Sequence, residues 1–358
     1  MYVALRDIRF ARGRFALMGA VVTLITTLVV FLYGLTGGLA SDASSAVADL
    51  PVQSIVFGAP HGATPEVSFS DSGIDAAQQA AWQSALGAEA VQPLGIAMSR
   101  MTATGGATAV SVIGASAPLL PPLLSGSAPA DGQVAVSRTT ASDDGVTVGG
   151  TVTVGSQRLT VSAITADRSY GHAPSVWTTE STWQQVSGAQ QPSALALTTA
   201  AGSGTAALDR AQNTDTVSRG AALAGIDGYS AEQGSLQLIQ GFLFAVSALV
   251  IGAFFTVWTV QRRPDIAVLK AVGASSGYLV RDALGQALIL LLLGTFTGAA
   301  IGLLGGALLS GGGMPFTLGA ATVAVPVLAM VLLGLLGAAL AVRRITSVDP
   351  LTALGANR

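Results

Sequence analysis

Four long apolar runs dominate the pattern of hydrophobic and polar positions along this chain. About 20 helical residues are needed to cross a hydrocarbon core roughly 30 Å thick, and each run reaches that length without a charged residue. The pattern therefore predicts four transmembrane helices, at residues 15–36, 236–260, 283–309 and 320–342.

The segment between the first two runs, residues 37–235, has a different pattern. Some stretches, such as residues 108–113, alternate apolar and polar positions as half-buried strands do. Residues 151–163 predict a hairpin, because two alternating runs flank a turn at residues 155–157. Residues 75–86 predict a helix. We therefore expect an α+β domain inserted between helices one and two.

The remaining segments are short. Residues 1–14 predict an amphipathic helix at the membrane surface, because apolar residues share one face and arginines lie largely away from it. Residues 261–282 are expected to form a loop with a short surface helix. Residues 310–319 form the other short loop, and residues 343–358 form a tail.

Charge predicts the orientation. Eleven of the 17 basic residues, but only four of the 19 acidic ones, lie in the N-terminal segment, residues 261–282 and the tail. Lys and Arg near helix ends favour the cytoplasmic side. We therefore expect a multi-pass protein of the plasma (cytoplasmic) membrane with both termini in the cytoplasm. The fold class is an α-helical membrane domain with four transmembrane helices plus an α+β extracellular domain.

Composition excludes several classes of function. The only lysine, Lys270, does not follow a glycine-rich phosphate loop, so the chain has no ATP site of that kind. There is no cysteine, His61 and His172 stand apart, and the apolar runs lack the ionisable residues of a proton-coupled carrier. We expect no catalytic residue, no metal site, no intrinsic cofactor and no nucleic-acid partner, and energy, if the chain uses any, must come from another subunit.

The third apolar run carries a glycine at every fourth position. On a helix these glycines form a groove that lets another backbone approach closely. The pattern leaves open whether the contact lies within one chain or between two copies. The glycines are Gly294, Gly298, Gly302 and Gly306.

Two short segments beside the helices carry the most specific motifs. The loop after the second run reads RRPDIAVLKAVGAS, and the tail contains RRITSVDPLTAL. Both resemble the permeases named after MacB and FtsX, the membrane subunits of one class of ABC transporter. The layout of one helix, a large outer domain and three helices is similar too. Asp265 stands where that family usually has Glu, and Pro264 precedes it. The matching tail residues are Arg343, Arg344, Asp349, Pro350, Ala353 and Leu354.

The resemblance implies a permease that is not itself an enzyme. It would form a homodimer and bind two copies of a cytoplasmic ABC ATPase, which holds ATP and Mg²⁺. The loop helix would pass the movement of the ATPase to the membrane helices and the outer domain. The residues implied in this coupling are Arg262, Arg263, Asp265, Ile266, Leu269, Ala271 and Gly273.

The small outer domain and four helices look most like the haem-efflux permeases of Gram-positive bacteria, the HrtB type, and DevC-like exporters. This implies export of haem or a similar amphipathic molecule. An FtsX-like subunit that regulates a cell-wall hydrolase, or a lipid or peptide exporter, stays open as an alternative.

A haem site needs apolar walls and an axial ligand such as His, Met or Tyr. Each candidate also has an ordinary interpretation, such as an aromatic belt at the membrane interface or packing in a core. The candidates are Tyr33, His61, Met98, Met101, Tyr170, His172, Tyr229 and Glu232.

Overall fold

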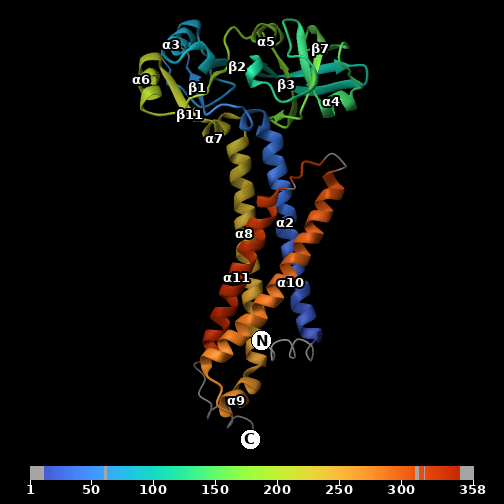
Figure 1. The fold of residues 1–358 in the computed structure, drawn as a ribbon, viewed down its shortest axis with the longest axis vertical. Coiled ribbons are helices and arrows are strands. Elements are labelled where there is room, and N and C mark those ends of the chain that lie inside the picture. The colour runs from blue at the N-terminus through green and yellow to red at the C-terminus, as the bar shows by residue number, and fades with distance from the viewer. Residues whose placement is uncertain (1–11, 60–62, 311–313, 318, 347–358) are drawn as a thin grey trace. The chain divides into compact units, whose positions relative to one another are not determined.

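The computed structural model describes residues 12–59, 63–310, 314–317 and 319–346. The chain forms two compact units: an inserted domain, Leu39–Gly234, and a helical unit made of the residues before and after it (Figure 1). Most of the expected N-terminal amphipathic helix and most of the expected tail lie outside the described residues.

Within the residues that the structure describes, four helices are long and apolar enough to cross a membrane, which confirms the prediction of four such helices. They extend beyond the apolar runs, because helix-compatible polar and alanine residues continue them. A short fifth helix, α9, lies between the second and the third. The bounds are α2 Arg12–Ala48, α8 Tyr229–Gln261, α9 Arg263–Ala271, α10 Ser276–Ser310 and α11 Ala320–Thr346.

Three of the four glycines of the α10 groove, Gly294, Gly298 and Gly302, face α2 of the same chain, whereas Gly306 faces the ring of Phe316. A Cβ placed on Gly298 would lie 2.5 Å from the carbonyl oxygen of Thr23, so no larger residue fits without a shift. The Thr27 hydroxyl donates a hydrogen bond to the Gly298 carbonyl, 3.1 Å away. Gly294 likewise faces Val22, and Gly302 faces Thr27. The structure thus gives these glycines a partner within the chain.

The inserted domain is built on one eleven-stranded sheet in the order β11-β1-β10-β2-β3-β9-β5-β7-β4, with β6 and β8 off this path. The strands are β1 Ser54–Gly58, β2 Val91–Ala103, β3 Gly106–Ala115, β4 Leu123–Gly126, β5 Gln133–Ser137, β6 Thr151–Val154, β7 Gln157–Thr165, β8 Ser169–Tyr170, β9 Ala173–Thr178, β10 Ala194–Leu197 and β11 Thr214–Ser218. The predicted hairpin is confirmed, since β6 pairs antiparallel with β7.

Helices cover the sheet at both ends. Helices α3 and α6 lie near β1 and β11, and α4 lies near β5 and β7 toward the other end (Figure 1). Helix α5 lies over β2 and β3, in the middle of the strand order. The predicted helix at residues 75–86 is confirmed, and Asp75 and Gln78 form its capping box. These helices are α3 Ala76–Leu86, α4 Arg138–Asp143, α5 Glu180–Ser187, α6 Ser203–Gln212 and α7 Arg219–Ala222.

Two paired glycines position α5 on the sheet. Gly95 of β2 lies opposite Gly114 of β3, and the ring of Trp183 lies directly over both, where any Cβ would overlap it. Trp183 is almost fully buried. The strand and helix content of this domain confirms the predicted α+β class.

Candidate functional site

A polar chain joins the end of α8 to α10. The Arg262 Nη1 donates to Oε1 of Gln286 at 2.7 Å, and the Gln286 Nε2 donates to Oδ2 of Asp282 at 2.9 Å. The Arg262 guanidinium also lies 5.1 Å from the centroid of the Trp258 ring, within the range of a cation–π contact. Because Gln286 is fully buried, these contacts hold the start of the α8–α10 loop against the bundle.

The short helix α9 follows directly. Pro264 stands in its first turn, where a missing N–H costs nothing because that group has no partner within a helix. Gly273 has a φ of +102°, and its N–H donates to the Lys270 carbonyl at 3.0 Å. The Ala274 N–H donates to the Leu269 carbonyl at 2.9 Å. These two bonds form a Schellman motif that ends the helix.

The two faces of α9 differ. Ile266 and Lys270 face the bundle and line a small cavity of about 20 Å³. Val268, Leu269 and Val272 form an exposed apolar surface, with exposed fractions of 59%, 38% and 83%. We call these three residues the α9 apolar surface.

The residues that the sequence proposed for coupling differ in exposure and in contacts. Leu269 and Ala271 are exposed, Ile266 faces inward, and Arg262 binds the bundle. For Arg263 and Asp265 the structure describes the backbone alone, in the first turn of α9. Val268 and Val272 are not among the motif residues. Their spacing of four residues nevertheless indicates that they share one face of the helix.

The substrate candidates are spread over both units. Tyr33 belongs to the helical unit, where its ring centroid lies 5.9 Å from that of Phe244. Met98 is exposed on β2, whereas Met101 is fully buried in the core. His61 lies outside the described residues.

The other four candidates lie in the inserted domain near the ends of α2 and α8. Tyr170 is buried 5.9 Å from the Phe69 ring, and burial raises its pKa well above the ordinary value. Tyr229, the first residue of α8, packs on the same core. His172 and Glu232 contact each other directly.

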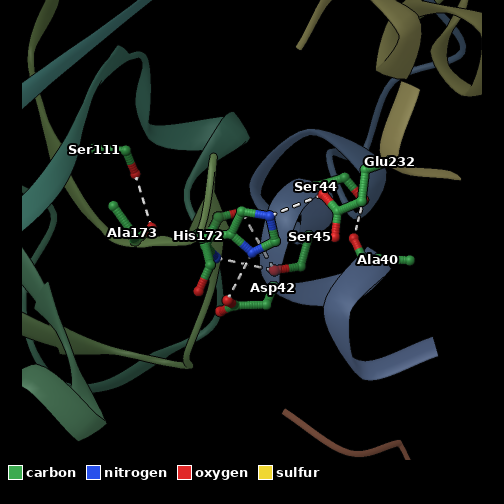
Figure 2. A network of polar contacts seen from close by, with 9 residues as sticks. Ala40, Asp42, Ser44, Ser45, Ser111, His172, Ala173 and Glu232 are labelled. Atoms are coloured by element: carbon green, nitrogen blue, oxygen red, sulfur yellow. Dashed lines mark hydrogen bonds and ion pairs between the residues drawn. The ribbon is translucent and has the colours of Figure 1, made fainter. Parts of the chain in front are cut away.

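His172 lies between two carboxylates (Figure 2). Its Nδ1 lies 3.1 Å from Oδ2 of Asp42, and its Nε2 lies 3.0 Å from Oε2 of Glu232. Asp42 belongs to the last turns of α2, and Glu232 to the first turn of α8. Asp42 was missed because it lies past the predicted end of helix one at residue 36, where the pattern no longer indicated a helix.

His172 stands in the turn of the β8–β9 hairpin, and this hairpin also contacts α2 through its backbone. The Gly171 N–H donates to the Ala43 carbonyl at 2.9 Å, and the Ser169 N–H donates to the Ser45 hydroxyl at 2.9 Å. Just before β8, the Arg168 Nε lies 3.1 Å from a carboxylate oxygen of Asp49. The hairpin therefore lies along the last turns of α2.

Opposing effects act on the protonation of His172. Partial burial disfavours the charged imidazolium and would lower its pKa. Hydrogen bonds to Glu232 and Asp42, and the negative charges of both, act in the other direction and outweigh it. The pKa of His172 therefore lies above its ordinary value.

Comparisons with known proteins agree with the motifs. The family named FtsX-like permease C-terminal matches residues 238–350, which confirms the resemblance to FtsX-type permeases. The chain is 26% identical to the "Putative hemin transport system permease protein HrtB" of Staphylococcus haemolyticus, over 99% of both chains. It is 27% identical to an uncharacterized ABC transporter permease of Mycobacterium tuberculosis, again over 99% of both.

Two solved structures also match, at 9% identity and a TM-score of 0.36 each. One is the extracellular domain of the noncanonic ABC-type transporter YknZ from Gram-positive bacteria, and the match covers 46% of this chain and 98% of that one. The other is the periplasmic region of MacB from Actinobacillus actinomycetemcomitans, covering 48% of this chain and 92% of that one.

Proposed function

We propose that this chain, an ABC transporter permease of the FtsX type, exports haem or a similar amphipathic molecule from the membrane. The observation that carries the proposal is the similarity to a HrtB protein named for hemin transport, which extends over both units. The cargo of that relative comes to this chain as a proposal, since the two sequences share only 26% of their residues.

The energy for export would come from a cytoplasmic ATPase bound at the α9 apolar surface. Val268, Leu269 and Val272 offer an apolar contact, and burial of such side chains stabilises an interface by about 25 cal/mol per Å². The contacts of Arg262 with Gln286 and Trp258 would pass a movement of α9 to the bundle. We further propose a homodimer with two ATPase copies, which hold the ATP and Mg²⁺.

The orientation is part of the same proposal. Both termini and α9 would lie in the cytoplasm, because the basic residues gather there. The inserted domain would lie outside the cell, where an ATP-driven movement could release the cargo.

Among the described candidates for haem contact, Met98 is exposed, at 55%, so its thioether sulfur is a candidate haem ligand. Tyr33 of the helical unit and Tyr229 of the inserted domain are only partly buried, so both stay candidates for contact with haem. His172 and Glu232 bind each other, so a haem ligand role for either would require that contact to open.

The test uses the permease reconstituted with its ATPase in liposomes loaded with haem. We expect haem to bind the purified permease at about one per dimer and to stimulate ATP hydrolysis, because a cargo that favours the closing movement lowers its barrier. Substitution of Met98, Tyr33 or Tyr229 by Ala should weaken binding if that residue contacts haem. Absence of both binding and stimulation would remove haem as the cargo.

An FtsX-like role in switching a cell-wall hydrolase is the alternative, and the family match at residues 238–350 is the observation that favours it. Full-length permease that retains a hydrolase on an affinity column, with no response to haem, would support this role in place of export.

A further inference from the structure

The turn that carries His172 has an unusual backbone. Gly171 and His172 stand between β8 and β9 with φ values of 55° and 62°, as in a two-residue hairpin whose central residues both have positive φ. Gly, Asn and Asp usually fill such positions, and other residues there cost about 1 kcal/mol or more. This chain places a histidine at the strained position, and the side chain of that histidine contacts both helix ends.

The arrangement around the ring calls for two donors. Both ring nitrogens lie about 3 Å from carboxylate oxygens, and ionised carboxylates only accept. A neutral imidazole has one N–H, whereas the imidazolium has two. The charged form therefore satisfies Asp42 and Glu232 together, with charge-assisted hydrogen bonds to both.

The hairpin is firmly joined to the sheet. β9 pairs with β3 on one side and β5 on the other. The Ser111 hydroxyl of β3 donates to the Ala173 carbonyl at 3.3 Å (Figure 2). It also lies 2.8 Å from the Ser175 hydroxyl of β9. A displacement of the hairpin therefore displaces the centre of the sheet.

Helices α2 and α8 are the two covalent connections between the units. Each runs through its connection without a break, α2 across residues 38–39 and α8 across residues 234–235. Any movement that the helical unit passes to the inserted domain along the chain must use these helices. His172 contacts a side chain of each one within the inserted domain.

We propose that the β8–β9 hairpin is a clasp that holds the ends of α2 and α8 together and makes both move with the sheet, with His172 as its positioning residue. The backbone N–H groups of Gly171 and Ser169 in this hairpin also donate hydrogen bonds to α2. Asp49 of the loop after α2 is paired with Arg168, and Tyr170, next to the turn, is buried. The functional part of this inference rests on the proposed export.

The chain has no cysteine, so two spin labels can report on the clasp directly. Ser41 of α2 and Ala231 of α8 are exposed near the two contacts and would be replaced by labelled cysteines in the full-length chain. We expect a narrow distance distribution for the parent at about pH 6, where the imidazolium dominates. His172→Asn suits the positive φ but loses at least one contact, so it should broaden the distribution.

Two further variants separate the clasp from the fold. His172→Gly relaxes the turn and removes the ring, so the protein should fold and still give the broad distribution. His172→Arg restores two charged donors and should return the narrow one. An unchanged distribution in both His172→Asn and His172→Gly would overturn the proposal.

A second readout measures coupling in the reconstituted complex. We expect His172→Asn to keep basal ATP hydrolysis and to lose haem export by roughly fivefold or more, the lower range of a typical coupling energy, with recovery in His172→Arg. If the parent complex exports no haem, the proposed function is wrong. The distance measurement would still test whether the hairpin holds the ends of α2 and α8 together. Normal export in His172→Asn would contradict the role of the clasp in coupling.

Discussion

At the residue scale, His172 shows how one side chain can join segments far apart in the sequence. It lies 130 positions from Asp42 and 60 from Glu232, and its ring contacts both because a tight turn projects it between two helices. Its ring is partly solvent-exposed, so the net energy of the two contacts is modest, on the order of 1 kcal/mol or less. The contacts therefore matter for joining α2, α8 and the hairpin at one point, more than for the stability that they add.

This arrangement predicts a pH dependence with a definite sign. The pKa of His172 is raised in the folded protein, so its stabilising contribution is complete below the unfolded pKa, about 6.5. The contribution is lost as pH rises through the folded value. We expect the thermal unfolding temperature of the full-length protein in detergent to fall by this contribution as pH rises above about 6.5. The loss should be absent in His172→Asn, and an equal loss in that variant would contradict the assignment.

At the scale of elements, the contact of α10 with α2 predicts a difference between glycines of one helix. Gly298→Ala would bring its Cβ to 2.5 Å from the Thr23 carbonyl oxygen, whereas a Cβ on Gly305 would meet nothing within 4 Å. Overpacking of this kind costs about 1–3 kcal/mol. The temperature of thermal unfolding in detergent should fall for Gly298→Ala and stay unchanged for Gly305→Ala. Equal falls in both variants would contradict the contact between Gly298 and α2.

The short helix α9 makes a separate prediction. Leu269→Asp places a charge in the α9 apolar surface, and burying that charge against the ATPase without a partner is unfavourable. We expect at least about a tenfold loss of ATPase binding, which corresponds to 1.4 kcal/mol, with insertion into the membrane unchanged. Co-purification of the ATPase measures this.

The control for that experiment is Leu123→Asp. Leu123 is similarly exposed, at 40%, but belongs to the inserted domain. The same change of chemistry there should leave ATPase binding intact. Equal binding by the parent and Leu269→Asp would remove the coupling role from α9.

At the scale of the whole molecule, the orientation follows from charge and can be measured with single cysteines in this cysteine-free chain. Ala128 of the inserted domain and Ser276 at the start of α10 are both exposed. We expect a membrane-impermeant maleimide to label Ala128→Cys in intact cells, and to label Ser276→Cys only after the membrane is opened. The reverse labelling would invert the topology.

The amino-acid sequence alone was enough to locate the membrane-spanning helices and the inserted domain, and to show the resemblance to FtsX-type permeases. A bilayer offers no hydrogen bonds to the backbone, so spanning segments must be helical, apolar and of a certain length, and such runs can be seen in one dimension. The loop and tail motifs are local too, and so is Gly273, whose positive φ ends α9. Residues 75–86 and the β6–β7 hairpin were readable for the same reason.

Only the tertiary structure decided which distant residues meet. The sequence showed a groove at Gly298 but not that α2 fills it, because a groove does not specify its partner. It proposed His172 and Glu232 separately and missed Asp42, because their meeting depends on the strand order that brings the β8–β9 turn to the ends of α2 and α8. Side chains of distant segments become neighbours only when the sheet between them is complete.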